Sequence, residues 1–125
     1  MSHEVVADCL NMIMNAKKAG KENIEVRIYS KFLIEVLRIA KKHDYLDYSL
    51  DESSKILKIK IKEINKCNAI KPRFDVKTED IDKYIRRYMP ARNFGILIIS
   101  TSKGIMTQNE AYEKNVGGSL IAYFY

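Results

Sequence analysis

The chain has little of what disulfide-rich, membrane-spanning or linker-containing proteins need. Its two cysteines, Cys9 and Cys67, are far apart and form no Cys-x-x-Cys pair. A disulfide framework is therefore not expected, and both thiols are expected to be small buried hydrophobic groups. The longest apolar runs are far shorter than the ~18–20 residues that a membrane helix needs. With two prolines and five glycines, the sequence shows no low-complexity segment, linker or repeat.

Groups that could carry out catalysis are also scarce. Of the two histidines, His3 lies near the start of the chain and His43 lies at a predicted helix end, and neither has a spacing relation to a serine nucleophile. Ser100 and Ser102 lack the Gly-x-Ser-x-Gly pattern, and the stretch around them lacks the phosphate-loop pattern. An enzyme, a metal site and a cofactor are therefore not expected.

The composition is that of a folded, water-soluble protein. Hydrophobic residues make up 46% of the chain and charged residues 30%, which is ordinary for a globular domain and argues against disorder. The N-terminal Met1-Ser2-His3-Glu4 has no basic start and no signal-type apolar stretch, so we expect an intracellular protein without a membrane partner. A chain of this length buries ~65–70% of its unfolded surface, enough for one compact unit or two small lobes.

The net charge of +6 is concentrated in the middle of the chain. Residues 55–92 carry 12 Lys/Arg against 5 Asp/Glu, whereas residues 1–54 carry 8 against 9 and residues 93–125 carry 2 against 2. A concentrated basic stretch favours an anionic polymer as partner, because each neutralised phosphate releases condensed counterions. A solvated lysine face is an equally common alternative, so the charge alone does not decide between the two.

The first half of the chain predicts an α-β-α-β-β lobe at residues 1–65. Apolar residues recur at three- and four-residue spacing in two stretches, which indicates amphipathic helices, and they alternate with polar residues in three others, which indicates strands. Ser30 is a suitable N-cap for the second helix. The predicted elements are a helix at 5–18, a strand at 24–28, a helix at 31–43 and strands at 45–50 and 56–64.

Hydrophobic and basic residues alternate in the last of these strands. Because side chains alternate across a strand, the two sets point to opposite faces. The hydrophobic set is Leu57, Ile59 and Ile61, and the basic set, the lysine ridge, is Lys58, Lys60 and Lys62. A solvated sheet face or a guarded sheet edge is a more common role for such a ridge than phosphate contact.

The second half predicts a mostly β lobe with short helices at residues 66–125. Together the two halves predict an α+β fold with two small lobes packed together. Thr78 is expected to cap one helix, which ends before Pro90, and Thr107 with Glu110 forms a capping box for another of about two turns. The other predictions are an extended segment at 70–76 with Pro72 at a sheet edge, a strand at 94–99, a helix stop at Gly117-Gly118 and a final strand at 119–125.

The stretch Ser100-Thr101-Ser102-Lys103-Gly104 lies between a predicted strand and a predicted helix. Its hydroxyls and ammonium can satisfy base edges, sugar hydroxyls and phosphate oxygens, and a glycine without Cβ lets the backbone approach a ligand closely. The pattern alone is weak, because a serine-rich turn before a helix more often serves local capping.

Over essentially its full length, the sequence resembles the family of the eighth protein of the small ribosomal subunit, a universal RNA-binding protein of the ribosome. The most specific matches are residues 100–107, Glu110-Ala111 and Gly117-Gly118, and the supporting ones are Asp8, Asn15 and Ser30-Lys31. Three further stretches resemble the archaeal and eukaryotic branch: residues 65–67, residues 72–76, and residues 90–92 with 94–95.

This resemblance implies a two-lobed fold that binds RNA mainly through the second lobe. The implied RNA-binding residues are Ser100, Thr101, Ser102, Lys103, Gly104, Gly117 and Gly118, with secondary contacts from Asn15, Ser30 and Lys31. The implied partners are small-subunit ribosomal RNA, at an irregular helix of its central domain, and neighbouring small-subunit proteins. The chain would be a cytoplasmic structural component that supports subunit assembly and is a monomer outside the ribosome. Because bacterial members also repress their own messenger RNA, that RNA is a further candidate partner, and a free-standing translational regulator stays open as the alternative.

Overall fold

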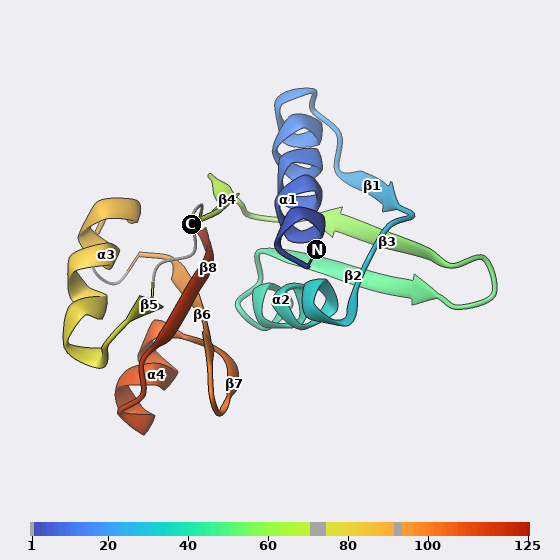
Figure 1. Cartoon of the computed structure of the whole chain (residues 1–125). Coiled ribbons are helices and arrows are strands. Elements are labelled where there is room, and N and C mark those ends of the chain that lie inside the picture. The colour runs from blue at the N-terminus through green and yellow to red at the C-terminus, as the bar shows by residue number, and fades with distance from the viewer. Residues whose placement is uncertain (1, 71–74, 92–93) are drawn as a thin grey trace. The chain divides into compact units, whose positions relative to one another are not determined.

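The computed structural model describes residues 2–70, 75–91 and 94–125, and the chain divides into two compact units (Figure 1). The first unit is Met1–Cys67 and the second is Asn68–Tyr125. Each unit combines helices with antiparallel strands, which confirms the predicted α+β class. Within the described ranges, no helix is long and apolar enough to cross a bilayer.

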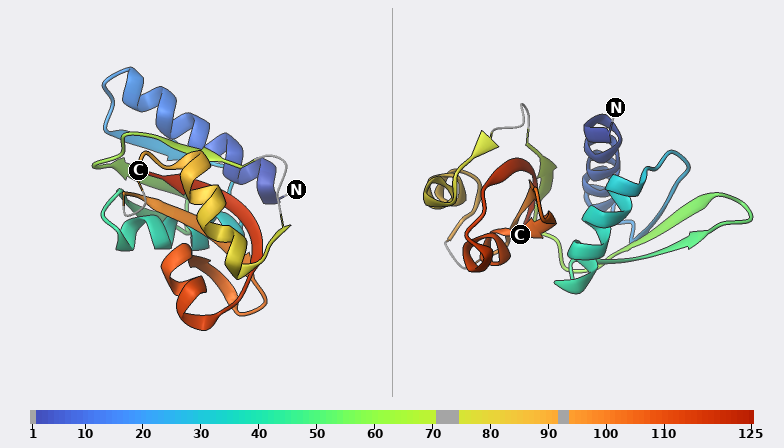
Figure 2. Two further views of the ribbon diagram at one scale, coloured as in Figure 1. Left: turned by 90° about the vertical axis from the view of Figure 1, so that its left-hand side faces the viewer. Right: turned by 60° about the horizontal axis from the view of Figure 1, so that its bottom comes forward.

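The first unit has the predicted order of elements. They are α1 (Ser2–Lys18), β1 (Asn23–Val26), α2 (Lys31–Lys42), β2 (Leu46–Asp51) and β3 (Ile56–Ile61). The strands form an antiparallel sheet in the order β1-β3-β2, and both helices lie on the same side of it (Figure 2). The apolar stripes of the helices are buried, because packing against the sheet removes them from water.

The start of α2 follows from Ser30, as predicted. The Ser30 backbone is extended, and its side-chain hydroxyl accepts a hydrogen bond from the backbone N–H of Leu33 at 3.2 Å. This bond satisfies one of the amide groups that a helix leaves unpaired at its first turn. The capping role of Ser30 is therefore confirmed.

Strand β3 alternates as predicted. Its hydrophobic residues Leu57, Ile59 and Ile61 are buried, whereas Lys58 and Lys60 are exposed. Lys62, the third member of the lysine ridge, is exposed just beyond the end of the strand. Since β3 is the central strand of its sheet, the ridge does not guard a sheet edge, and the solvated face is the reading that fits.

The second unit contains a five-stranded sheet and two short α-helices. Its elements are β4 (Cys67–Ala69), which begins at the boundary, β5 (Asp75–Val76), a 3-10 helix (Thr78–Asp80), α3 (Ile81–Tyr88), β6 (Ile96–Thr101), β7 (Gly104–Thr107), α4 (Gln108–Lys114) and β8 (Gly118–Phe124). The strand order is β4-β8-β6-β7, and β5 also pairs with β8. All of the registered pairs are antiparallel.

One buried cluster joins the sheet of the second unit to its helices. Ile81 and Ile85 of α3 share it with Leu97 and Ile99 of β6. Tyr84 and Tyr88 are partly buried against the same cluster, so both tyrosines contribute to its packing. This packing holds strand β6 rigidly, and β6 in turn supports the residues that follow it, 102–104.

Two predictions for the second unit need correction. Thr78 does not cap α3: it is the first residue of the 3-10 helix that leads into α3, and the residues before each helix make no side-chain capping bond. Glu79 and Asp80 lie in that first turn, where their negative charges interact favourably with the positive end of the helix dipole. This stabilises the helix start although no side chain caps it. The extended segment predicted at 70–76 is a strand only at Asp75–Val76, and its residues 71–74, with Pro72, lie outside the described residues.

Candidate nucleic-acid interface

The stretch 100–104 is the end of a β-hairpin, which corrects the prediction of a turn that leads directly into a helix. Strands β6 and β7 pair antiparallel, with Thr101 opposite Gly104 (Figure 1). Ser100 and Thr101 are therefore strand residues, and the loop consists of Ser102 and Lys103 alone. The sequence does not predict strand β7, because its four residues do not alternate clearly between hydrophobic and polar side chains. They form a strand because they pair with β6.

Gly104 supplies the backbone conformation that closes this hairpin. Its φ is +110°, whereas neither Ser102 nor Lys103 has a positive φ. A positive φ costs glycine little because glycine has no Cβ, and hairpin turns commonly place such a residue beside the loop. A Cβ built at Gly104 meets nothing within 4 Å. Glycine is therefore needed here for its conformation and not for space.

The Thr101 hydroxyl is used within the hairpin itself. It donates a hydrogen bond to the carbonyl oxygen of Gly104 at 2.7 Å and accepts one from the backbone N–H of Lys103 at 3.1 Å. These two bonds tie the strand end to both sides of the loop. The sequence left open whether the hydroxyls of this stretch make local hydrogen bonds or bind a ligand. The Thr101 hydroxyl makes local hydrogen bonds.

The two loop residues present their side chains to solvent. Ser102 and Lys103 are both exposed, and Ser100 is half-buried. Within the part of the chain that the structure describes, the Ser102 hydroxyl takes part in no hydrogen bond. A braced turn therefore offers a neutral hydroxyl, which both donates and accepts, beside an ammonium that only donates.

Gly117 and Gly118 do not stop α4, contrary to the prediction. The helix ends at Lys114, and Asn115 adopts the left-handed conformation with φ 52° and ψ 50°. Asparagine tolerates this conformation better than most residues, so it serves as the helix stop in place of glycine.

The two glycines allow close approach of backbones instead. A Cβ at Gly117 would overlap the carbonyl oxygen of Val76, and a Cβ at Gly118 would overlap the carbonyl oxygen of Ser100. Gly118 also lies opposite Thr101 in the β6–β8 ladder. The hydroxyl stretch and the glycine pair, which are separate in the sequence, are therefore side by side in one site.

Two polar residues that the sequence did not single out belong to the same site. Ser119 lies opposite Ser100 on β6 and opposite Asp75 on β5. The Ser119 hydroxyl donates a hydrogen bond to the Asp75 carboxylate at 2.6 Å. Asp75 and Ser119 are 44 positions apart in the chain, so no local pattern could have joined them.

Helix α4 fixes the base of the hairpin. The predicted capping box is present, because Thr107 and Glu110 each accept a hydrogen bond from the other's backbone N–H through their side chains. The buried Gln108 side chain accepts a bond from the Leu97 N–H at 2.8 Å and donates one to the Gly95 carbonyl oxygen at 3.2 Å. These bonds tie the first turn of α4 to β6 and make the hairpin rigid at its base.

The remaining predicted site residues, Asn15, Ser30 and Lys31, belong to the first unit. Asn15 is exposed in the last turns of α1, and Lys31 is exposed at the first position of α2. The Ser30 hydroxyl is occupied by its capping bond. Of these three residues, Asn15 and Lys31 therefore present side chains that a ligand can contact.

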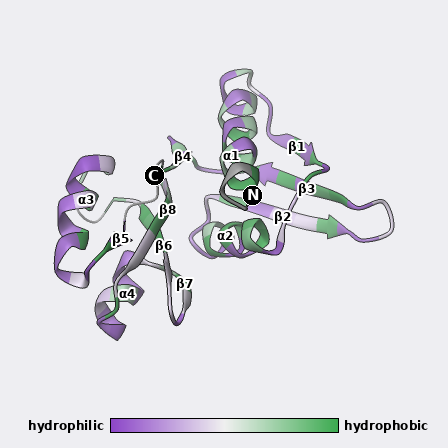
Figure 3. Cartoon of the chain, in the orientation of Figure 1, coloured by the Kyte–Doolittle hydropathy of each residue, from purple (hydrophilic) through white to green (hydrophobic). Residues whose placement is uncertain are grey.

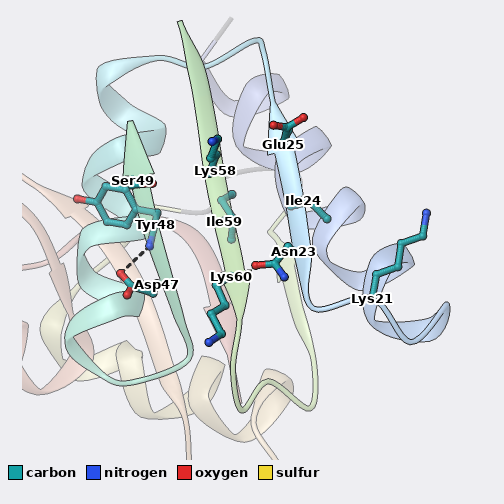
Figure 4. Close-up of a pocket in the computed structure, with 10 residues that line it drawn as sticks. All are labelled: Lys21, Asn23, Ile24, Glu25, Asp47, Tyr48, Ser49, Lys58, Ile59 and Lys60. Carbon is teal, nitrogen blue, oxygen red and sulfur yellow. Dashed lines mark hydrogen bonds between the residues drawn. The ribbon is translucent and has the colours of Figure 1, made fainter. Parts of the chain in front are cut away.

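An open groove of about 800 Å³ lies over the exposed face of the first unit's sheet (Figure 4). Lys58 and Lys60 line it, but Glu25 lies opposite Lys58 and Asp47 lies opposite Lys60 on the neighbouring strands. A hydrogen bond from Lys41, 3.0 Å away, lowers the pKa of Asp47 and keeps it charged. The lysine ridge is therefore partly neutralised, which weakens its attraction for phosphates.

The buried thiols offer no reactive centre. Cys9 and Cys67 are both buried, as predicted, and burial raises the pKa of each thiol to about 12. Both thiols are therefore protonated near neutral pH, and a thiol is a much weaker nucleophile than a thiolate. Among the described side chains, no group of three or more His, Cys, Asp and Glu is placed to hold a metal ion.

Similarity to known proteins extends over nearly the whole chain. The model of a family described as ribosomal protein S8 matches residues 4–125. The small ribosomal subunit protein uS8A of Schizosaccharomyces pombe is 41% identical over 125 residues, which cover 97% of this chain and 96% of the relative. The small ribosomal subunit protein uS8 of Nanoarchaeum equitans is 43% identical over 129 residues, which cover 100% of both chains.

Proposed function

Since the chain belongs to the ribosomal protein S8 family, we infer that it is a structural protein of the small ribosomal subunit. It binds ribosomal RNA and acts among the other proteins of that subunit, in the cytoplasm, and it is not an enzyme. The observation that carries this conclusion is the 41–43% identity over nearly the full length of a fungal and an archaeal relative.

The second unit is proposed as the main RNA-binding part, through the β6–β7 hairpin and the adjoining Gly117-Gly118. A-form RNA hides its major-groove edges, so proteins read its distorted shape, its 2′-hydroxyls and its displaced bases. A short hydroxyl such as that of Ser102 reaches such groups without the bulk of a long side chain, and Lys103 adds attraction to phosphate. Because Thr101 and Gly104 brace the loop, little conformational entropy is lost when the RNA binds.

The proposed target is an irregular helix in the central domain of small-subunit ribosomal RNA. An irregular helix exposes base edges that a regular duplex hides, and the Ser102 hydroxyl and the Asp75 carboxylate supply a donor and acceptors for them. Asn15, Ser30 and Lys31 are proposed to make secondary contacts with the RNA. The protein is proposed to be a monomer outside the ribosome and to support subunit assembly by holding this helix together with neighbouring proteins.

A free-standing translational regulator is the second candidate function. A messenger RNA, including the protein's own, that folds into a similar irregular helix would present the same groups to the hairpin. The chemistry of the site favours the two RNAs equally, and only their relative affinities separate the two functions.

Co-sedimentation with small ribosomal subunits at moderate salt tests the proposal. We expect the protein to co-sediment stoichiometrically with subunits depleted of their own copy and to bind a transcript of the central-domain helix. Failure to join the subunits, combined with robust binding to another RNA, would favour the regulator and overturn the structural role.

A further inference from the structure

Four aromatic rings form a continuous row in the second unit, away from the hairpin loop. Tyr88 is the last residue of α3, Tyr123 lies in β8, Tyr125 follows it, and Phe94 precedes β6. The ring centroids of Tyr88 and Tyr123 are 5.3 Å apart, and those of Tyr123 and Tyr125 are 6.1 Å apart with nearly parallel planes. Phe94 continues the row at 6.2 Å from Tyr125, with its plane tilted by 50°. These separations are those of attractive aromatic pairs.

The row runs from the core to the solvent. Tyr123 is 7% exposed and belongs to the buried cluster, Tyr88 and Tyr125 are half-buried, and Phe94 is 49% exposed. Among the described residues, Phe94 is the one aromatic side chain in the set of exposed large hydrophobic residues. Core packing accounts for Tyr123 and Tyr88, but it does not account for the outer surface of Phe94.

The backbone beside Phe94 holds the outer rings in place. Gly95 has a φ of +111°, and a Cβ at this position would lie 2.7 Å from the Cβ of Tyr125 and 3.0 Å from the sulfur of Met89. Only glycine allows both this conformation and this approach. Phe94 and Tyr125 are therefore held next to each other by the fold, with the Phe94 ring half exposed to solvent.

Basic residues lie near the row, and one of them, Arg86, is paired with Asp82 of the same helix. The guanidinium of Arg87 lies 5.5 Å from the ring centroid of Tyr88, and α3 is mostly hydrophilic in Figure 3. Residues 83–109 contain five Lys/Arg and no Asp/Glu. Aromatic rings combined with arginine and lysine are the chemistry that binds single-stranded RNA, because bases stack on the rings while the cations attract the phosphates.

We propose that the Phe94 ring, supported by Tyr125, is a stacking platform for an unpaired base of small-subunit ribosomal RNA, as a second contact besides the hairpin. This rests on the proposed ribosomal RNA binding. Phe94 precedes β6 and the hairpin loop follows it, so the two contacts are separated by the six residues of that strand, about 20 Å. The antiparallel β8 begins with Gly118 beside the loop and ends next to Tyr125.

Two contacts at opposite ends of one strand fix the direction of the RNA across the protein, which one short loop cannot do. Every base has a face that can stack, so the platform accepts any of the four bases and selects for one that is unpaired and accessible. The hairpin then supplies the hydrogen bonds that distinguish the site, while the platform adds affinity and orientation.

Substitutions of Phe94 test the platform, with a transcript of the complete small-subunit ribosomal RNA of the same organism as the probe. Phe94→Ala and Phe94→Leu should each weaken binding roughly 5- to 150-fold, by the same factor at low and high salt, because base stacking involves no ion release. Phe94→Trp should keep wild-type affinity. Since the chain has no tryptophan of its own, the fluorescence of this Trp variant reports on residue 94 alone and should be quenched when RNA binds.

The controls separate this proposal from the function on which it rests. Thermal unfolding of each variant should stay cooperative and well above the assay temperature, because the Phe94 side chain is half exposed and lies outside the buried cluster. If Phe94→Ala binds RNA as tightly as the wild type while Ser102→Ala does not, the platform is overturned and the hairpin site stands. If the wild type does not bind the transcript, the proposed function itself fails.

Three further outcomes would also overturn the platform. Full affinity in Phe94→Leu with a loss in Phe94→Ala would show a general apolar contact in place of stacking. Unchanged affinity of Phe94→Ala for the free RNA, with reduced incorporation into subunits, would assign Phe94 to a neighbouring protein. An unquenched Phe94→Trp signal in the saturated complex would contradict stacking in the same way.

Discussion

Replacing Gly118 by alanine should destabilise the second unit and weaken RNA binding together. The added Cβ would overlap the carbonyl oxygen of Ser100, which belongs to the strand directly opposite. Neither partner is a flexible side-chain end, so the β6–β8 ladder has to open beside the hairpin. Overpacking of this kind costs about 1–3 kcal/mol, and a domain of this size loses ~4–8 °C in melting temperature per kcal/mol. We expect a melting temperature roughly 5–20 °C below that of the wild type.

Gly104→Ala is the matched control for this prediction. Its Cβ meets no atom within 4 Å, so its cost, about 1–3 kcal/mol, comes only from holding a non-glycine residue at φ +110°. Hydrogen exchange separates the two variants: Gly118→Ala should expose the amides that pair Ser100 and Thr101 with β8, whereas Gly104→Ala should affect only the loop. A Gly118→Ala protein within about 0.5 kcal/mol of the wild type, with protected β8 amides, would refute the close-approach argument.

Three further predictions concern the rest of the molecule. RNA affinity should fall as salt rises, because contacts to phosphates contribute to it. In a log–log titration, a measurable part of the affinity should survive several hundred millimolar salt, since the hairpin contacts are largely uncharged. Complete loss of binding would contradict a hydroxyl-based site. Changing Lys58, Lys60 and Lys62 together to glutamine should leave the preference for small-subunit over random RNA unchanged, and if the ridge touches RNA at all, binding to both should weaken by the same factor; a selective loss of ribosomal RNA binding would place recognition on the first unit. Because burial raises the pKa of Cys9 and Cys67 to about 12, neither thiol should react with iodoacetamide near neutral pH until denaturant is added; intact-mass measurement of rapid alkylation in the folded protein would disprove their burial.

The elements that the sequence predicts correctly are those whose pattern is strong within their own length. Helix α2 has both an apolar stripe and a capping serine, and β3 alternates through six residues. Strands β4 and β7 have only three and four residues. They exist because β8 and β6 offer them backbone partners, and those partners are not visible in a local window.

The candidate site was predictable in part for the same reason. The hydroxyls and the glycine at 100–104 are visible as a local composition, and Thr107 with Glu110 as a local spacing. The role of Gly118 was assigned wrongly, because a glycine pair after a helix usually marks its end. Its actual neighbour is Ser100, and that contact, like the bond between Ser119 and Asp75, exists only after the strands pair.

The central claim is that the exposed hairpin loop binds ribosomal RNA, and the affinity of Ser102→Ala for the central-domain helix tests it most directly. If the Ser102 hydroxyl meets a buried base or sugar edge, its removal leaves that RNA group unpaired and costs ~1–3 kcal/mol, about one to two decades in Kd. The melting temperature should not change, because the side chain is exposed. A folded Ser102→Ala protein with wild-type affinity would contradict the claim and leave residues 100–104 as a structural turn.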